Sequence, residues 1–320
     1  MPMPTPMRPR VLRPGDSVAL VSPSGPVPAD RVEHAVAVLT SWGLKPHVYP
    51  SVFKRFGFLG GTDEERAVDL NAAMSDPHIR AVWCTRGGYG VQRIVDRLDL
   101  TAIAHDPKLV IGFSDITGLH LALWRRIGLA TIHGPVAAQL DKGAGSITAL
   151  GAHHAIMTTD PVTLQADRAE LTFGVRSRGR AEGPLLGGNL SLLAATIGTP
   201  DWPDLTGAIL LLEDVSEEPY RVDRMLTHLL RSGLLTGVAG IAIGQFTECG
   251  EVAGVLAERL GPLGVPILGG LPVGHGEQHV AVPLGTRAVL DTDAGTLTVD
   301  AAVSVGAGEA NPLQPPAFGI

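Results

Sequence analysis

Short apolar runs alternate with amphipathic stretches through the first half of the chain, and this alternation limits the possible folds more than any other feature. Four runs are typical of buried strands that end in a turn: VALVSPSG (18–25), AVWCT (81–85), KLVIGF (108–113) and LATIHGP (129–135). The stretches between them have the pattern of helices: residues 30–43, a segment from the capping box Thr62–Glu65, residues 91–99 and residues 115–128. Strands that alternate with helices predict an α/β domain with a parallel sheet covered on both faces.

The loops after these predicted strands point to a binding edge. SPSG, RGGYG, FSD and HGP each follow the carboxyl end of a strand. In open parallel sheets, ligands bind at that edge. We therefore expect the first domain, residues 1–160, to carry a site there.

The character of the sequence changes at about residue 161. Residues 161–180 are predicted to be a linker, because LTFGVRSRGRAEG (171–183) is polar and has no helical period. Residues 181–310 are predicted to be a smaller, β-rich α/β domain, and residues 311–320 an irregular tail. The elements expected in this domain are strands 208–214, 238–246 and 280–285, helices 220–233 and 251–261, and a hairpin in 287–300 around Asp293.

Composition excludes several classes of protein. The chain has 320 residues, a net charge of −7 and scattered acidic residues, whereas a nucleic-acid-binding protein needs a basic face. No apolar run reaches the roughly 18 residues of a membrane span, and no apolar signal segment follows the N-terminal residues. The two cysteines, Cys84 and Cys249, argue against a disulfide framework and a cysteine metal site. We therefore expect a cytoplasmic protein.

Ser114, in GFSDI, stands between a predicted buried strand and a predicted helix. A hydroxyl at such a corner can act as a nucleophile, with N–H groups of the helix N-terminus beside it for an oxyanion. Serine is also typical of a helix N-cap, and local rules favour the cap because GFSDI lacks the second glycine of a G-x-S-x-G elbow.

A serine nucleophile needs a base and an acid that orients the base. His275 lies in the glycine-flanked loop GGLPVGHGEQ and His133 ends a predicted strand; spacing does not separate the two, and His279 is a third candidate. Glu213 ends a buried strand, where a carboxylate is unfavourable unless it is paired or functional; solvation at the strand end is the alternative. The glycines of RGGYG (86–90) either face an anion or form a plain turn, and their spacing does not fit a dinucleotide motif.

Taken in order, these segments resemble the LD-carboxypeptidase family, which includes muramoyltetrapeptide carboxypeptidase and the microcin C self-immunity peptidases. The resemblance runs over nearly the whole chain, through segments such as GDSVALVSPSG, CTRGGYGVQRIVDRLD, KLVIGFSDITGLHLAL, LLLEDVSEEPYRVDRMLTHL and LPVGHGEQHVAVPLG. It implies an N-terminal α/β domain with a parallel sheet like that of class I glutamine amidotransferases. It also implies a smaller β-rich C-terminal domain and an active site between the two.

The resemblance also implies the site residues. The matching triad is Ser114, Glu213 and His275, with oxyanion N–H groups from Asp115 and Gly88. It further implies a serine peptidase without metal or cofactor, which releases D-Ala from murein tetrapeptide after meso-diaminopimelate during cell-wall recycling. The resemblance also implies that the protein is a homodimer.

A free substrate carboxylate must be bound, for which Asn189 and the RGGYG loop at Gly87 are the predicted contacts. Two other functions stay open. One is the microcin C type of activity, hydrolysis of a peptidyl or aminoacyl adenylate, which needs an aromatic surface that the four tryptophans do not clearly supply. The other is a protein that binds a wall peptide without cutting it.

Overall fold

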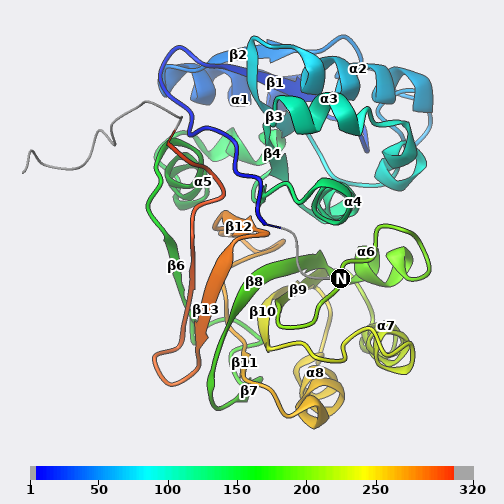
Figure 1. Cartoon of the computed structure of the whole chain (residues 1–320), viewed down its shortest axis with the longest axis vertical. Coiled ribbons are helices and arrows are strands. Elements are labelled where there is room, and N and C mark those ends of the chain that lie inside the picture. Colours follow the sequence, from blue (N-terminus) through cyan, green and yellow to red (C-terminus); the bar gives the residue numbers. More distant parts are fainter. Residues whose placement is uncertain (1–4, 306–320) are drawn as a thin grey trace, which may run out of the picture.

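The computed structural model describes residues 5–305, which form two sheets with helices around them (Figure 1). The predicted tail, 311–320, and the predicted end of the second domain at residue 310 lie outside the described residues. Figure 1 shows the sheet of the N-terminal half, in blue to green, above the sheet of the C-terminal half.

The first sheet confirms the parallel arrangement expected from the alternating pattern. Its strand order is β12-β5-β4-β3-β1-β2, and β1 to β5 are all parallel. The strands are β1 (Ser17–Val21), β2 (Lys45–Val48), β3 (Ile79–Cys84), β4 (Leu109–Gly112), β5 (Thr131–His133) and β12 (Val282–Leu284). The residues of β4 are buried throughout, as an apolar run covered on both faces requires.

Helices cover both faces of this sheet. They are α1 (Ala29–Ser41), α2 (Asp63–Ser75), α3 (Leu100–His105), α4 (Thr117–Ile127) and α5 (Ile147–Met157), with short 3₁₀ helices η3 (Ser114–Ile116) and η4 (Ala137–Lys142). The capping box predicted at Thr62 and Glu65 is confirmed: the Thr62 side chain accepts from the Glu65 N–H, and the Glu65 carboxylate accepts from the Thr62 N–H.

The prediction of one helix over residues 91–99 is wrong. Two 3₁₀ turns, η1 (Val91–Arg93) and η2 (Val95–Arg97), occupy this segment. Its buried residues Ile94 and Val95 lie three and four positions after the buried Val91, a spacing that a 3₁₀ turn also satisfies. The segment is too short for the apolar pattern to distinguish the two helix types.

The second sheet is mixed, with strand order β6-β14-β13-β8-β9-β10-β11-β7. Strands β8 to β11 are parallel to one another and the remaining strands pair antiparallel. The hairpin predicted around Asp293 is confirmed as β13–β14. The new elements are β8 (Arg180–Asn189), β9 (Ile209–Val215), β10 (Gly240–Thr247), β11 (Ile267–Leu268), β13 (Arg287–Asp291), β14 (Thr296–Val299), α6 (Leu190–Thr196), α7 (Pro219–Arg231), α8 (Ala253–Leu260) and η5 (Gly261–Leu263).

The strands of the two sheets do not follow the predicted division of the chain. The expected linker, 161–180, contains β6 (Val162–Gln165) and β7 (Arg176–Ser177), which form the two edges of the second sheet. Conversely, β12 comes from the C-terminal half but pairs with β5 of the first sheet, with Val282 opposite His133. Figure 1 shows β12 between the two sheets. The likeness to class I glutamine amidotransferases stays a prediction.

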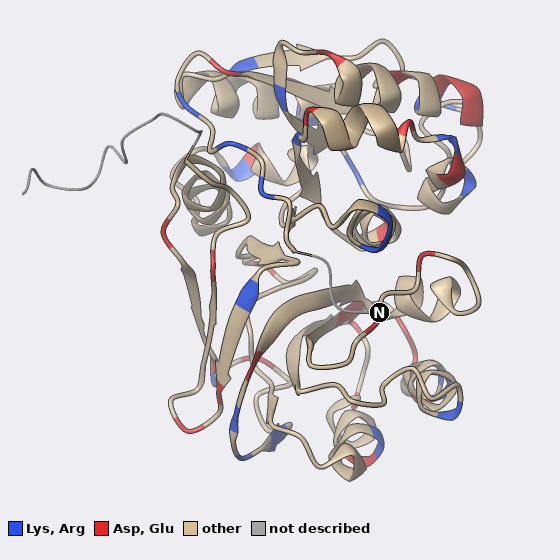
Figure 2. Ribbon diagram, viewed as in Figure 1, with Lys and Arg blue, Asp and Glu red and all other residues tan. Residues whose placement is uncertain are grey.

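A shared apolar core joins the two domains. One cluster of buried side chains includes Trp83 and Ile111 from the first sheet together with Leu211 and Leu290 from the second. Charged residues lie mainly on the outer helices and loops of both domains, with both signs interspersed (Figure 2). None of the helices in residues 5–305 has the length and apolar content needed to cross a bilayer.

Candidate active site

Ser114 lies at the corner between β4 and α4, which confirms the position predicted for it. Its φ is 63°, in the left-handed region, which is uncommon for a residue with a Cβ. The α4 helix begins three residues later, at Thr117, and the Ser114 side chain caps neither η3 nor α4. The structure therefore favours the strained strand-to-helix corner over the helix cap.

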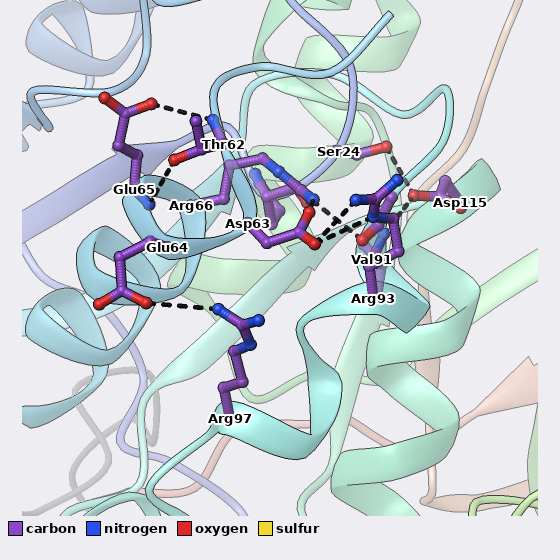
Figure 3. A network of polar contacts seen from close by, with 12 residues as sticks. Ser24, Thr62, Asp63, Glu64, Glu65, Arg66, Val91, Arg93, Arg97 and Asp115 are labelled. Carbon is purple, nitrogen blue, oxygen red and sulfur yellow. Dashed lines mark hydrogen bonds and ion pairs between the residues drawn. The ribbon is translucent and has the colours of Figure 1, made fainter. Parts of the chain in front are cut away.

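The carboxylate of Asp115 connects the loops around this corner, as Figure 3 shows. Its Oδ2 accepts hydrogen bonds from Ser24 Oγ at 2.6 Å and from the Val91 N–H at 2.9 Å. These partners lie in the loops after β1 and β3. Burial raises the pKa of this carboxyl, and the two donors act against that shift. The Asp115 side chain thus holds three loops together next to Ser114.

Arg66 reinforces the same connection (Figure 3). This fully buried side chain donates to the carbonyls of Pro23 and Gly90, the latter at 2.9 Å, and pairs with Asp63 at 2.5 Å. Sequence reasoning considered only the N–H of Asp115 and did not consider Arg66. The available signal for Asp115 was an acid two residues after the predicted buried strand 108–113, which is close to the signal that identified Glu213.

The RGGYG loop contacts the serine directly. A Cβ added at Gly87 would lie 2.8 Å from the Cβ of Ser114, so this position excludes any side chain. The Gly87 carbonyl accepts from the Gly25 N–H at 3.0 Å. In a trans peptide the next N–H points the opposite way, so the Gly88 N–H is directed away from Gly25.

His275 and Glu213 form a hydrogen-bonded pair in the second domain. Nδ1 of His275 lies 2.8 Å from Oε2 of Glu213, which is fully buried inside β9, two residues before the strand ends. Gly274, with φ 131°, precedes the histidine, and a Cβ there would lie 2.8 Å from the same carboxylate oxygen. Bonding through Nδ1 leaves Nε2 as the ring nitrogen for proton transfer. The carboxylate predicted to orient a base is therefore in contact with a histidine.

One cavity brings the two domains together. Its volume is about 510 Å³, and Ser114 of the first domain and His275 of the second both line it. The other lining residues are Pro28, Arg31, Arg86, Gly87, Gly88, Phe113, Val136, Ala138 and Gln139. The Phe113 ring packs against His275, with centroids 4.5 Å apart. The predicted nucleophile, the predicted base and the RGGYG loop thus line the same cavity.

The two alternative histidines are buried behind this cavity. His133 and His279 pack against Phe113, and the ring nitrogens of both have no hydrogen-bond partner among the described residues. Burial lowers the pKa of His279 to about 3 and shifts that of His133 in the same direction. Neither residue lines the cavity with Ser114. Their surroundings favour His275 as the base.

Asn189 has a structural position, which does not support its predicted contact with a substrate carboxylate. Its Nδ2 donates to Asp214 Oδ1 at 2.9 Å, and its Oδ1 accepts from the Leu192 N–H and caps α6. It is buried and is not part of the cavity lining. Burial raises the pKa of Asp214 to about 6, and bonds from Ser191 act against this. Both polar ends of Asn189 therefore serve the packing of α6 against β9.

Both cysteines, Cys84 and Cys249, are free and buried. Among residues 5–305, no three His, Cys, Asp or Glu side chains are grouped so as to hold a metal ion.

Comparisons with known families match both domains. The model of the LD-carboxypeptidase N-terminal domain matches residues 18–134, and that of the LD-carboxypeptidase C-terminal domain matches residues 182–290. A Streptomyces coelicolor protein, provisionally named a carboxypeptidase, is 48% identical over 304 residues, covering 92% of this chain and 96% of the relative. The murein tetrapeptide carboxypeptidase of Pseudomonas aeruginosa is 37% identical, covering 86% of this chain and 92% of the relative.

Solved structures show the same fold. The muramoyltetrapeptide carboxypeptidase from Oxalobacter formigenes superposes with a TM-score of 0.80 at 30% identity, covering 90% of this chain and 100% of the other. An MccF-like protein from Bacillus anthracis superposes with a TM-score of 0.83 at 26% identity, covering 92% of this chain and 99% of the other.

Proposed function

The chain belongs to the LD-carboxypeptidase family, and from this premise we propose that it is a serine carboxypeptidase that releases the terminal D-Ala from murein tetrapeptide. The observation that carries the proposal is the 2.8 Å bond between His275 and Glu213 at a cavity that Ser114 also lines. The names of the Pseudomonas and Oxalobacter relatives support the substrate.

The proposed chemistry divides the work between the two domains. His275 Nε2 accepts the proton of Ser114 as the serine oxygen attacks the scissile carbonyl, and Glu213 fixes the ring tautomer through Nδ1. The buried carboxylate also stabilises the imidazolium that forms. The protonated ring then delivers its proton to the leaving amine of D-Ala, and water hydrolyses the acyl-enzyme.

The oxyanion is proposed to bind the N–H groups of Asp115 and Gly88. Asp115 follows the serine at the start of the helix, where N–H groups are directed toward a ligand. The direction of the Gly87–Gly88 peptide, set by the bond from Gly25 to the Gly87 carbonyl, supports Gly88 as the second donor.

A second candidate is hydrolysis of a peptidyl or aminoacyl adenylate. The tryptophans give it no support, since Trp83 and Trp124 are buried and none of the four lines the cavity. An aromatic pair that sequence reasoning did not identify does favour it: Phe58 and Tyr89 are more than half exposed, with ring centroids 5.5 Å apart. Tyr89 follows Gly88 of the cavity wall, so this pair offers a stacking surface beside the site.

Product analysis distinguishes these functions. The protein is incubated with murein tetrapeptide and, separately, with a peptidyl-adenylate analogue, and the products are identified by mass spectrometry. D-Ala from the tetrapeptide supports the carboxypeptidase, whereas cleavage of the analogue alone supports the second candidate. Ser114→Ala is expected to release neither product, and EDTA is expected to leave the rate unchanged.

A labelling experiment tests the remaining possibility, a protein that binds a wall peptide without cutting it. A serine-directed phosphonate should modify the wild type and spare Ser114→Ala. Equal labelling of both proteins, or of neither, would contradict the role of Ser114 as the nucleophile.

The cellular setting belongs to the same proposal. Murein peptides released during wall recycling arrive in the cytoplasm, where we place the enzyme. We also propose a homodimer, which light scattering coupled to size exclusion tests: a mass near 33.4 kDa would contradict it, and twice that mass would support it.

A further inference from the structure

Two arginines line the cavity, and their partners differ. Arg31 is already neutralised, because its guanidinium forms an ion pair with Asp141 and also donates to the Ala138 carbonyl at 3.3 Å. Arg86 is exposed and donates once, to the Pro26 carbonyl at 2.8 Å. Among the described residues, no carboxylate pairs with Arg86. Since a guanidinium carries five N–H donors, most of those of Arg86 remain for a ligand.

Arg86 is also adjacent to the reacting serine. It precedes Gly87, whose missing Cβ would lie 2.8 Å from the Cβ of Ser114 and 3.0 Å from its Oγ. An enzyme that removes one residue must place the terminal carboxylate about one residue, ~3.8 Å between Cα atoms, beyond the scissile bond. Arg86 precedes the residue that touches Ser114 and lines the same cavity, so a terminal carboxylate held in that cavity lies beside its side chain.

We propose that Arg86 forms the carboxylate subsite, binding the C-terminal carboxylate of the residue that is released and so selecting the terminal peptide bond. This inference rests on the proposed carboxypeptidase function. A planar guanidinium binds a carboxylate through two parallel N–H···O bonds, which fixes the orientation of the terminal residue as well as its position. The carbonyl of Pro26 holds the side chain at the cavity wall.

The other polar residues of the region are less suited to this role. Asn189 bonds to Asp214 and caps α6 outside the cavity. Gln139 lines the cavity, but its Oε1 accepts from the Val136 N–H at 3.2 Å within its own turn. Arg31 has Asp141 as its counter-charge. Arg86 is thus the cavity-lining cation without an opposite charge among the described residues.

The experiment compares two substrates that differ only in this group: the tetrapeptide with a free C-terminal carboxylate and the same peptide with a C-terminal carboxamide. Values of kcat/KM are measured for the wild type, Arg86→Ala and Arg86→Lys. Arg55→Ala is the matched control, because Arg55 is also exposed, also donates to one backbone carbonyl, and lies outside the cavity lining. It changes the net charge by the same amount.

The wild type is expected to prefer the free acid by about 10-fold to 100-fold, the range for a charge-assisted bond. Arg86→Ala should lose this preference, through a lower kcat/KM for the acid and an unchanged value for the amide. Arg86→Lys should retain part of it, and Arg55→Ala all of it. A preference that survives in Arg86→Ala, or an equal loss for both substrates, would overturn the inference.

A binding measurement separates this inference from the proposed function. Calorimetry on Ser114→Ala, with and without Arg86→Ala, gives Kd for the acid and the amide in the absence of turnover. If the wild type cleaves neither peptide but the acid binds more tightly through Arg86, the proposed function is wrong and the subsite stands. Equal binding of acid and amide, or no binding of either, overturns the subsite.

Discussion

The left-handed backbone at Ser114 makes a prediction that needs no knowledge of the substrate. With φ at 63°, residue 114 is held in a conformation that glycine adopts freely and other residues adopt at a cost in free energy. Replacing Ser114 by Ala keeps the Cβ and the strain, whereas replacing it by Gly removes both. Both variants lack the Ser114 hydroxyl, so the difference in stability between them reports on the backbone alone.

The size of the effect follows from two opposing terms. The left-handed conformation costs a residue with a Cβ about 1–2 kcal/mol. This gain is offset by about 0.4–1 kcal/mol, because an unfolded chain with glycine at position 114 has more conformational freedom to lose on folding. Ser114→Gly should therefore be more stable than Ser114→Ala by about 1 kcal/mol, or ~2–4 °C in Tm for a domain of this size.

Thermal unfolding followed by circular dichroism, at one protein concentration and pH, measures the difference. Thr227, inside α7, supplies the control pair, because a helical position reverses the order: Thr227→Gly should be less stable than Thr227→Ala by up to about 1 kcal/mol. If Ser114→Gly unfolds at or below the temperature of Ser114→Ala while the control pair behaves as expected, the serine corner is not strained and its link to a nucleophile loses its physical basis.

Three further predictions concern the site and its support. Glu213→Gln should lower kcat by about 10³–10⁴-fold, because an amide selects the wrong tautomer of His275. The Tm of Glu213→Gln should not fall, because the substitution removes a fully buried charge. If steady-state assays show that this variant keeps a tenth of the wild-type activity, Glu213 does not orient His275 for catalysis. Gly87→Ala should reduce kcat at least about 10-fold by displacing Ser114, whereas Gly254→Ala, with open space around it, should not. Burial lowers the pKa of His279 from its ordinary value of 6.5 to about 3. At a pH below 6.5, the ring therefore takes up a proton when the protein unfolds. The free energy of unfolding should therefore fall as the pH drops from 6.5 toward 4, and it should fall less steeply in His279→Phe. If urea titrations give the same dependence of unfolding free energy on pH for the wild type and the variant, His279 is not buried as a neutral ring.

The first domain could be predicted largely from the sequence because its signals are local. The strand ending at Cys84 and the capping box at Thr62 each depend on a few consecutive residues. The edge strands were not predictable in the same way. The strand predicted over 280–285 is confirmed as β12, although its place in the first sheet was not predicted. β7 has two residues, and β6 pairs with a strand more than 100 residues away, at Thr296 to Val299. Such short segments carry no periodicity, and only the assembled sheet defines them.

The choice of base shows the same limit at the site. Spacing left His133, His275 and His279 open, and the structure places all three rings against Phe113. They differ in exposure and in hydrogen bonding: of these three histidines, only His275 bonds to a carboxylate and lines the cavity. Both properties depend on how the second domain packs on the first, so the sequence pattern of the histidine loops does not contain them.

Asp115 illustrates how one position can serve two purposes that sequence analysis does not separate. Its predicted role uses the backbone N–H, as an oxyanion donor next to Ser114. Its observed role uses the side chain, which joins the loops of Ser24 and Val91. The two roles do not compete, because different atoms carry them. A backbone held at φ 63° needs surroundings that determine it, and a buried carboxylate one residue away, bonded to two other loops, supplies them. The strain at Ser114 and the network beside it are therefore parts of one arrangement.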